Sequence, residues 1–477
     1  MMQRKRIFGI ETEYGCLPPK DRAMGTSDSI AARVKDFVFH RNRYGIIDVH
    51  YRDWEEPPGN GGFLFNAGRM YIDMGHLEYS TPECQSIFDI VAYDKGGERI
   101  LQSALERLGL KGKAAFIKNN IDYVTGSTFG CHENYLLKRH VSFMKVVIPS
   151  LLPFLVTRQI FAGAGRIGVH KSRFIGYEED GEPMLGKVNF QISQRADHVV
   201  TEIYQWIQFS RAIINTRDEP LADHTKYRRL HLLVGDSNMS EYATALKVGT
   251  TSLVLDMIEE GGWREWIVLE DPVRAIKEIS RDEGMRWEVR LGDGRVSNAV
   301  DIQRMYWEEC RRRYEGRDEE TDWVLREWGE VLGCLGEGRV WELVDRVDWV
   351  AKRWLIERFM EEEGVEWGDP WLQSIDLEYH NIDPESGLYY CLEKMGYVRR
   401  VVRDEDIEKA ISEPPSNTRA RARAEAMKIL HEKRIKCIVD WDSIYLENRG
   451  HIDMKDPYDT YSTLISYLKG LKGNSRP

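Results

Sequence analysis

The 477-residue sequence has no closely paired cysteines, no long apolar run and no excess of basic residues. Its seven cysteines are scattered without a CxxC pair, which argues against a disulfide framework or a zinc site and indicates reduced thiols. The formal net charge of −11 argues against general nucleic-acid binding. We therefore expect a globular protein whose partners do not include nucleic acid.

The sequence also gives no sign of a membrane segment. The most apolar stretch, 146–156, contains two prolines and is too short to span a bilayer. The basic residues at 1–6 are followed by Glu11 and Glu13, a pattern unlike that of a signal peptide. We expect a cytoplasmic protein with no membrane partner, large enough for two domains or for one large domain with an appendage.

Two segments near the N-terminus, 6–15 and 66–83, hold five carboxylates: Glu11, Glu13, Asp73, Glu78 and Glu83. Side chains alternate between the two faces of a strand, so Glu11 and Glu13 should share one face of the first segment. By the same rule, Arg69, Tyr71 and Asp73 should share one face of the second. The sequence therefore predicts two strands that present acidic groups together.

Carboxylates on one face of a sheet repel each other and lose hydration when they are buried. A divalent cation offsets both costs, and magnesium prefers hard oxygen ligands. Magnesium and ATP together form a phosphoryl-transfer site. The two segments are therefore predicted to build a magnesium–nucleotide site.

Two histidines and two arginines are further candidates. His132 and His231 lie in polar contexts beside predicted strands. Imidazole can bind a metal beside carboxylates, although a structural role is the commoner alternative for a single histidine. Arg217 could clamp a phosphate, or it could pair with an aspartate in a turn. Arg195 has the same two interpretations.

Two glycine-rich segments match nucleotide-binding patterns only in part. Residues 163–168 fit GxGxxG, but no clear strand–helix unit surrounds them and no acidic residue follows about twenty positions later. Residues 181–188 nearly fit a P-loop, but Val188 has no hydroxyl group for magnesium and acidic residues precede the segment. Neither segment is assigned to nucleotide binding.

Helix and strand patterns mix without regular β–α–β alternation, which favours an α+β fold. The periodicity predicts helices at 27–41, 87–108, 239–261, 418–434 and 458–471, and strands at 114–118, 188–193, 230–235 and 437–445. Pro414 and Pro415 interrupt the chain before its last elements, which could form a small C-terminal domain.

The chain resembles the Pup ligase/depupylase family, which shares the carboxylate–amine ligase fold of glutamine synthetase. The resemblance covers nearly the whole chain and rests on motifs that include FGIETEYG (8–15), GRMYIDMGHLEYSTPEC (68–84), KNNID (118–122), GCHENYL (130–136), SQRADH (193–198), INTRDEP (214–220), YRRLHLLVGDSN (227–238), PPSNTRARAR (414–423) and VDW (439–441). It implies a curved antiparallel sheet packed with helices over residues 1–400. It also implies a small C-terminal domain, 401–477, that contributes to the ATP site.

The resemblance assigns a role to each candidate residue. Asp73 would be the catalytic carboxylate. The implied magnesium ligands are Glu11, Tyr71 and Glu78, joined by Glu13, His132 and His231. The implied ATP contacts are Arg69, Thr81 and Trp441, with Arg217 on phosphate.

The implied activity is ATP- and Mg2+-dependent ligation. A Pup-like modifier would be phosphorylated on its C-terminal glutamate and joined to a lysine of a target protein. Two alternatives stay open, namely hydrolysis of the same amide by a depupylase, and a small-molecule carboxylate–amine ligase or phosphotransferase. The FGIETEYG and VGDSN segments are similar to the ligase, whereas the five-residue spacing from Asp73 to Glu78 is similar to the depupylase.

Overall fold

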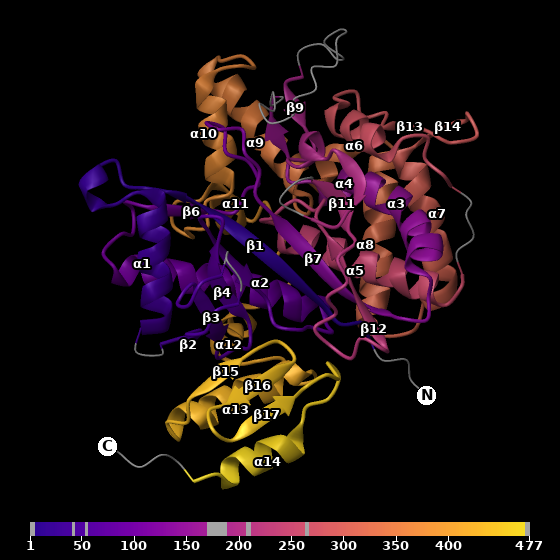
Figure 1. The fold of residues 1–477 in the computed structure, drawn as a ribbon. Helices are drawn as coiled ribbons and strands as arrows, with labels where there is room; N and C mark the ends of the chain where they lie inside the picture. The colour runs from indigo at the N-terminus through magenta and orange to yellow at the C-terminus, as the bar shows by residue number, and fades with distance from the viewer. Residues whose placement is uncertain are drawn as a thin grey trace.

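A computed structural model describes residues 5–40, 43–52, 56–168, 188–206, 211–262 and 267–472. Its centre is a ten-stranded sheet (Figure 1). The strands are β1 (Phe8–Leu17), β2 (Gly45–Ile47), β3 (Gly61–Leu64), β4 (Arg69–Asp73), β5 (His76–Ser80), β6 (Ala115–Ile117), β7 (Cys131–Lys138), β10 (Thr201–Tyr204), β11 (Ala212–Asn215) and β12 (Tyr227–Leu232).

The sheet order is β10-β11-β12-β7-β1-β5-β4-β3-β2, and β6 pairs with the end of β1. The β10–β11 pair is parallel, and the other pairs of this sheet are antiparallel. Strand β1 therefore lies at the centre, between the β4–β5 hairpin and β7. Residues on β1 are close to side chains from segments far away in the sequence.

Helices surround the sheet: α1 (Ser27–Phe39), α2 (Ile87–Arg107), α3 (Ile148–Thr157), α4 (Gln159–Ala162), α5 (Glu241–Glu259), α6 (Pro272–Arg281), α7 (Ala299–Tyr314), α8 (Glu319–Gly336), α9 (Asp348–Glu363), α10 (Pro370–Tyr379), α11 (Leu388–Lys394) and α12 (Asp404–Ser412). Short helical turns are η1 (Arg22–Met24), η3 (Phe143–Val147), η4 (Ala196–His198) and η5 (Val340–Leu343). Two small ribbons pair β8 (Arg166–Ile167) with β9 (Phe190–Gln191) and β13 (Glu288–Arg290) with β14 (Val296–Asn298).

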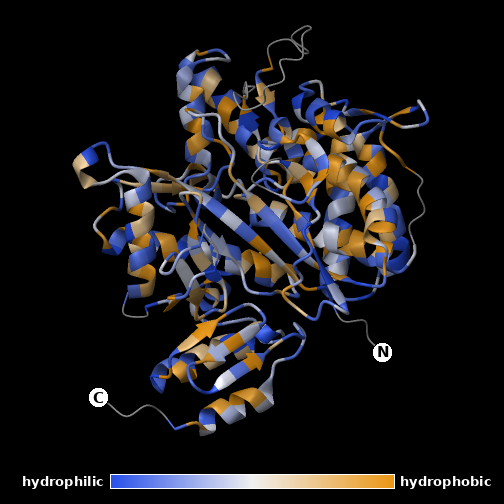
Figure 2. Cartoon of the chain, in the orientation of Figure 1, coloured by the Kyte–Doolittle hydropathy of each residue, from blue (hydrophilic) through white to orange (hydrophobic). Residues whose placement is uncertain are grey.

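The two faces of β1 differ. The Thr12 hydroxyl donates a hydrogen bond of 3.1 Å to Asp94 of α2, so Thr12 faces the helices. Side chains alternate along a strand, which places Glu11 and Glu13 on the opposite face. Helix α5 packs on β7, and the largest apolar cluster extends from there through α3, α7 and α8. Helix α3 is built almost entirely from apolar residues (Figure 2).

The chain ends in a smaller unit below the sheet in Figure 1, which contains α13 (Arg419–Glu432), β15 (Cys437–Val439), β16 (Ser443–Leu446), β17 (Gly450–Asp453) and α14 (Ser462–Gly470). These elements have their own apolar cluster, which Phe63 of β3 joins. Helix α12 packs on α2 of the larger body. The proposed division at residue 400 stays a prediction.

The α+β class and the mainly antiparallel sheet are confirmed. Predicted helix 87–108 corresponds to α2 and 239–261 to α5, whereas α1 begins after a Thr26 cap and ends at Phe39. The predicted strand 437–445 was wrong, because a turn at 440–442 divides it into β15 and β16. Within 163–168 only the two-residue strand β8 forms, so no Rossmann unit is present there. Residues 181–187 lie outside the described ranges.

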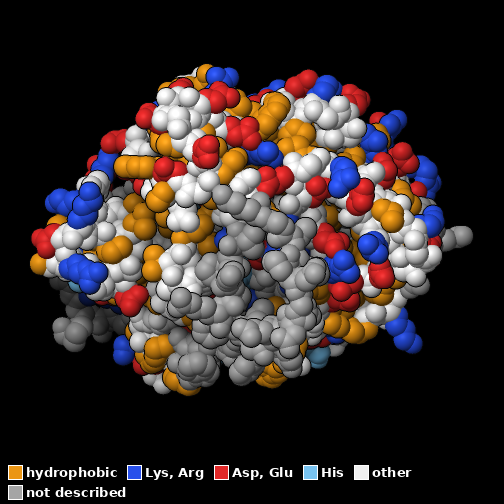
Figure 3. Space-filling view, turned by 90° about the horizontal axis from the view of Figure 1, so that it is seen from above, with side chains coloured by type: hydrophobic (Ala, Val, Ile, Leu, Met, Phe, Trp, Pro, Cys, Tyr) orange, Lys and Arg blue, Asp and Glu red, His pale blue; other side chains and the backbone are white. Residues whose placement is uncertain are grey.

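Among the described residues, no helix combines the length and the apolar character needed to cross a bilayer. Seen from above, acidic and basic side chains alternate around the rim of the molecule and do not gather by sign (Figure 3).

Candidate functional site

Three neighbouring strands bring the predicted carboxylates together. Glu13 of β1 lies opposite Glu78 of β5, and Glu78 lies opposite Tyr71 of β4. The Tyr71 hydroxyl donates a hydrogen bond to Glu78. Carboxylate oxygens of Glu13, Asp73 and Glu78 come within 4.8 Å of one another. The strand register therefore gathers three acidic groups at one point.

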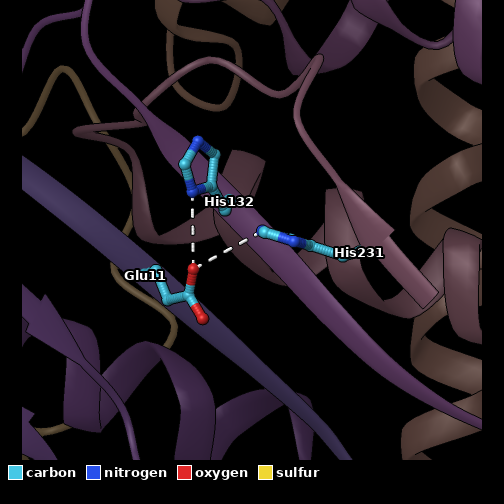
Figure 4. Close-up of side chains that lie close together, drawn as sticks. All are labelled: Glu11, His132 and His231. Carbon is cyan, nitrogen blue, oxygen red and sulfur yellow. Dashed lines mark ion pairs between the residues drawn. The ribbon is translucent and has the colours of Figure 1, made fainter. Parts of the chain in front are cut away.

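A second group forms around Glu11. Nδ1 of His132 lies 3.4 Å from Glu11 Oε2, and Nε2 of His231 lies 3.6 Å from the same oxygen (Figure 4). His132 is the register partner of Glu11 on β7, and His231 comes from β12. Asn134 donates a 2.9 Å hydrogen bond to the other oxygen of Glu11. Side chains from two strands, β7 and β12, thus surround the Glu11 carboxylate of β1.

The charges of the three-carboxylate group act on one another. Burial raises the pKa of Glu78 well above its usual range, and the charges of three neighbouring carboxylates raise it further. Burial also raises the pKa of Tyr71, whose hydroxyl stays protonated as a donor. In the described ranges, no lysine or arginine forms an ion pair with Glu11, Glu13 or Glu78. A divalent cation bound here would offset the repulsion among these carboxylates.

In the group around Glu11, His231 and Glu11 have the protonation states of metal ligands. Burial lowers the pKa of His231 to about 4, so its ring is neutral at neutral pH. Its Nε2 is buried and has no hydrogen-bond partner among the described atoms. Burial alone would raise the pKa of Glu11, but the nearby imidazoles of His132 and His231 hold that pKa well below its usual range.

Both groups fit divalent cations. Three clustered carboxylates offer the hard oxygen ligands that magnesium prefers. The Glu11 group adds a neutral imidazole with an unused buried nitrogen and an ionised carboxylate, which are the states that bind a metal. The structure brings together all six proposed metal ligands and Asp73, and their roles stay predictions.

A cavity of about 230 Å³ opens beside Glu11 and Tyr71. Arg69, Thr81 and Trp441 all contribute to its wall. These are the three residues that the resemblance assigns to ATP. The cavity and the carboxylates therefore form one continuous site, which shares Glu11 and Tyr71.

The strand framework holds Thr81 and Arg69 in place. The Thr81 amide donates to the Ile10 carbonyl at 2.9 Å, and the Thr81 hydroxyl accepts from the Ile10 amide at 3.0 Å. Arg69 donates to both oxygens of Glu56, at 2.5 and 3.2 Å, and to Asp48 at 3.4 Å. Its guanidinium also lies 4.4 Å from the centre of the Tyr71 ring.

Arg217 lies outside the cavity wall. Its exposed guanidinium pairs with Glu219 at 2.5 Å. Asp218, the alternative turn partner, pairs instead with Arg139 and with Arg228, the latter at 2.9 Å. The turn-pair interpretation is therefore wrong, and the phosphate contact of Arg217 stays a prediction.

Arg195 is buried and donates a 2.5 Å hydrogen bond to the Phe129 carbonyl. Burial and the nearby charge of Arg211 lower the pKa of Arg195 to about 10. Asp197 pairs with Arg281 at 2.7 Å, so the turn-pair alternative is wrong here too. The phosphate interpretation of Arg195 also stays a prediction.

Sequence reasoning missed several residues of the cavity wall, among them Glu56, Arg229 and Arg419. Arg229 had a signal that was not used, because it stands two positions before His231 and therefore shares its face of β12. Its Nε is buried without a hydrogen-bond partner in the described structure. Glu56 had no such signal, since its place depends on the path of a loop.

Gly130 keeps space open between the two groups. A Cβ atom at this position would lie 2.4 Å from Nε2 of His132 and 2.6 Å from Oε1 of Glu13. Both distances are far below normal contact, and both neighbours are candidate ligands. A glycine is therefore needed here for volume, although its φ angle is ordinary.

Comparison with known proteins gives a consistent result. A family model described as Pup-ligase protein matches residues 6–445. A Pup–protein ligase of Nocardioides sp. is 40% identical over 480 residues, covering 97% of this chain and 99% of the relative. A Pup–protein ligase of Kribbella flavida is 40% identical over 479 residues with the same coverage.

Two solved structures are similar in fold. The complex between the prokaryotic ubiquitin-like protein Pup and its ligase PafA superposes with a TM-score of 0.84 at 34% identity, covering 98% of this chain and 91% of that chain. The Pup ligase PafA in complex with ADP gives a TM-score of 0.75 at 34% identity, covering 87% of this chain and 91% of that chain.

Proposed function

The chain belongs to the Pup-ligase protein family, and from this premise we propose that it is an ATP-dependent ligase. It joins a Pup-like protein modifier, through its C-terminal glutamate, to a lysine of a target protein. The relatives are named for this ligation, and one solved relative holds ADP while another holds Pup.

The observation that carries the proposal is the position of Asp73. Its carboxylate belongs to the same group as Glu13 and Glu78, beside the cavity whose wall includes Arg69 and Trp441. A carboxylate next to a metal–nucleotide site can accept the proton of an attacking amine. Asp73 is therefore the proposed catalytic base.

In this proposal a carboxylate of the modifier's C-terminal glutamate takes the γ-phosphoryl group of ATP, which gives an acyl phosphate and ADP. The lysine amine then attacks the acyl carbon, an isopeptide bond forms, and inorganic phosphate leaves. Asp73 takes the proton that the amine loses. The balance is one ATP consumed for each isopeptide bond made.

The other residues bind and orient. Arg69, Thr81 and Trp441 hold the nucleotide in the cavity, and Arg217 contacts phosphate when the nucleotide is bound. The proposed magnesium ligands are Glu11, Glu13, Tyr71, Glu78, His132 and His231. Magnesium, when bound, supplies positive charge that polarises the phosphoryl oxygens and offsets the repulsion among the carboxylates.

The test is ADP release from ATP and Mg2+, measured with and without a Pup-like modifier that ends in glutamate. We expect release by the wild type to depend on the modifier, and Asp73→Asn to lower it about 10²- to 10⁴-fold, the usual contribution of a positioned base. A lysine-bearing target protein should become conjugated in the same mixture.

The control is Asp36→Asn, which changes a side chain that is 68% exposed on α1 and should leave the rate unchanged. Release without modifier dependence would contradict the proposal. Cleavage of a modifier–lysine conjugate without net ADP formation would point to the hydrolase alternative instead.

A further inference from the structure

The C-terminal unit reaches the cavity through one turn. Trp441 lies in the turn between β15 and β16, and it contributes to the cavity wall. Its ring meets the ring of Phe63 edge-on, with centroids 5.0 Å apart. The elements around Trp441 have a separate apolar cluster below the sheet (Figure 1). The position of this ring over the cavity therefore depends on contacts across the boundary between the two parts.

One such contact comes from α13. Arg423 is fully buried, and its Nη1 donates to the Trp441 carbonyl at 2.8 Å. Its Nη2 donates to the Ala67 carbonyl at 2.9 Å, and the guanidinium also pairs with Glu83 of the larger body. The guanidinium carbon lies 4.9 Å from the centre of the Trp441 ring. Arg423 thus joins the turn at Trp441 to the larger body.

A second contact comes from the loop before β3. Nη2 of Arg52 donates to the Val439 carbonyl at 2.7 Å, and Nη1 donates to Asp440 at 3.0 Å. Val439 and Asp440 are the two residues that precede Trp441. Nε of Arg52 donates to Asp48 at 2.9 Å, and this aspartate is buried. One planar side chain therefore holds the turn at two points, and a third hydrogen bond fixes that side chain to Asp48 of the larger body.

This chain of contacts continues to a second residue of the cavity wall. Asp48 also accepts a 3.4 Å hydrogen bond from Arg69, which is a proposed nucleotide contact. Hydrogen bonds of guanidinium to carboxylate are among the stronger ones in proteins, and the fixed geometry of the guanidinium lets it bridge several acceptors. Through Asp48, Arg52 thus connects the turn at Trp441 to Arg69, and Trp441 and Arg69 both line the nucleotide cavity.

We propose that Arg52 is a positioning residue that holds Trp441 over the nucleotide cavity. This inference rests on the proposed nucleotide site. Arg52 itself is absent from the cavity wall in the described structure, so it acts through the turn that carries Trp441. Loss of Arg52 frees this turn, and the nucleotide must then order it on binding, which costs affinity.

The experiment is a titration of the full-length protein with ATP and Mg2+, which gives the dissociation constant of the nucleotide. Arg52→Ala should raise this constant about tenfold, the factor that corresponds to 1.4 kcal/mol. The rate at saturating ATP should stay within about twofold, because no reacting group is altered. Arg421→Ala is the matched control, since Arg421 is exposed on α13 and pairs with Glu425 at 2.9 Å within the helix.

A double-mutant cycle separates positioning from general damage. If Arg52 acts through Trp441, then Arg52→Ala should have no further effect on ATP affinity in a Trp441→Ala background. Additive losses would overturn the proposal, as would an unchanged dissociation constant in Arg52→Ala. Failure of wild-type protein to bind ATP would instead refute the proposed function. Arg52 is suited to this test because its side chain is 16% exposed, whereas removal of Arg423 leaves Glu83 with one arginine fewer in the interior.

Discussion

Ionisable side chains lie on both sides of strand β1, and the two sides differ in charge balance. On the helix side lies a buried ion cluster, defined as Asp94, Lys95, Glu98 and Lys118, which contains two acids and two bases. On the other side lies the carboxylate face, defined as Glu11, Glu13, Asp73 and Glu78. Of these, Glu11, Glu13 and Glu78 pair with no lysine or arginine in the part of the chain that is described.

The difference separates structural charge from functional charge. In the buried ion cluster, Lys118 lies 3.1 Å from Glu98, and Lys95 lies 3.3 Å from the same carboxylate. Folding neutralises these groups with partners that the chain itself provides. On the carboxylate face the chain tolerates repulsion, which is relieved when a cation binds. Such a site can be recognised because Glu11, Glu13 and Glu78 pair with no lysine or arginine among the described residues.

The largest change in the free energy of unfolding is expected from a substitution in the buried ion cluster. Lys118→Met leaves two buried carboxylates with Lys95 alone, and removal of one partner from a buried ion pair costs about 3–5 kcal/mol. Urea denaturation should show this loss in the free energy of unfolding. Lys113→Met is the control, because Lys113 is exposed and hydrogen-bonds only the Gly109 carbonyl within the described structure. Equal stability of both variants would mean that the ion cluster is not needed for folding.

The next effect concerns Glu83, whose charge is balanced by Arg419 at 2.7 Å and by Arg423. Burial opposes ionisation, but these two arginines lower the pKa of Glu83 to about 2 from an ordinary value of 4.5. A lowered pKa stabilises the fold above pH 4.5, and this stabilisation is lost as the pH falls toward 2. At 1.36 kcal/mol per pKa unit it amounts to about 3 kcal/mol.

Glu83→Gln should therefore be less stable than the wild type at pH 7, and the difference should shrink as the pH falls from 4.5 toward 2. Denaturation curves at several pH values measure this difference. Glu425→Gln serves as the control on α13. A difference that stays constant with pH would refute the ionic role of Glu83.

The smallest predicted effect concerns Glu78 on the carboxylate face. Its substitution should raise the free energy of unfolding, whereas the two substitutions above should lower it. The pKa of Glu78 is raised, so without metal the wild type loses stability as the pH rises above the ordinary value of 4.5. Glu78→Gln removes this loss and keeps an acceptor for the Tyr71 hydroxyl. At pH 8 without Mg2+ the variant should therefore have a higher free energy of unfolding than the wild type.

Thermal unfolding with and without Mg2+ checks this prediction. The cation should stabilise the wild type more than Glu78→Gln, because it binds the folded state with fewer ligands in the variant. Glu362→Gln, an exposed change on α9, should behave as the wild type. Destabilisation by Glu78→Gln in the absence of metal would contradict the view that this face is strained by its own charge.

Much of the site follows from local rules in the sequence. Alternation along a strand places Glu11 and Glu13 on one face, and β-pairing then brings His132 beside Glu11. The remaining contacts depend on how distant segments pack. Arg52 meets Asp440 across 388 residues, and no periodicity encodes that distance. The turn at 440–442 was read as continuous strand because apolar and β-branched residues lie on both sides of it, although Asp440 and Asp442 are of a type that favours turns.

Gly130 limits how this chain can evolve. Any side chain at position 130 would meet the His132 ring and the Glu13 carboxylate with its first carbon atom, before its chemical character could matter. A residue larger than glycine would have to displace one of these two side chains. The residue should tolerate substitution as poorly as the ligands do, although it contributes no ligand atom. A search for functional positions by chemical type alone would pass over it.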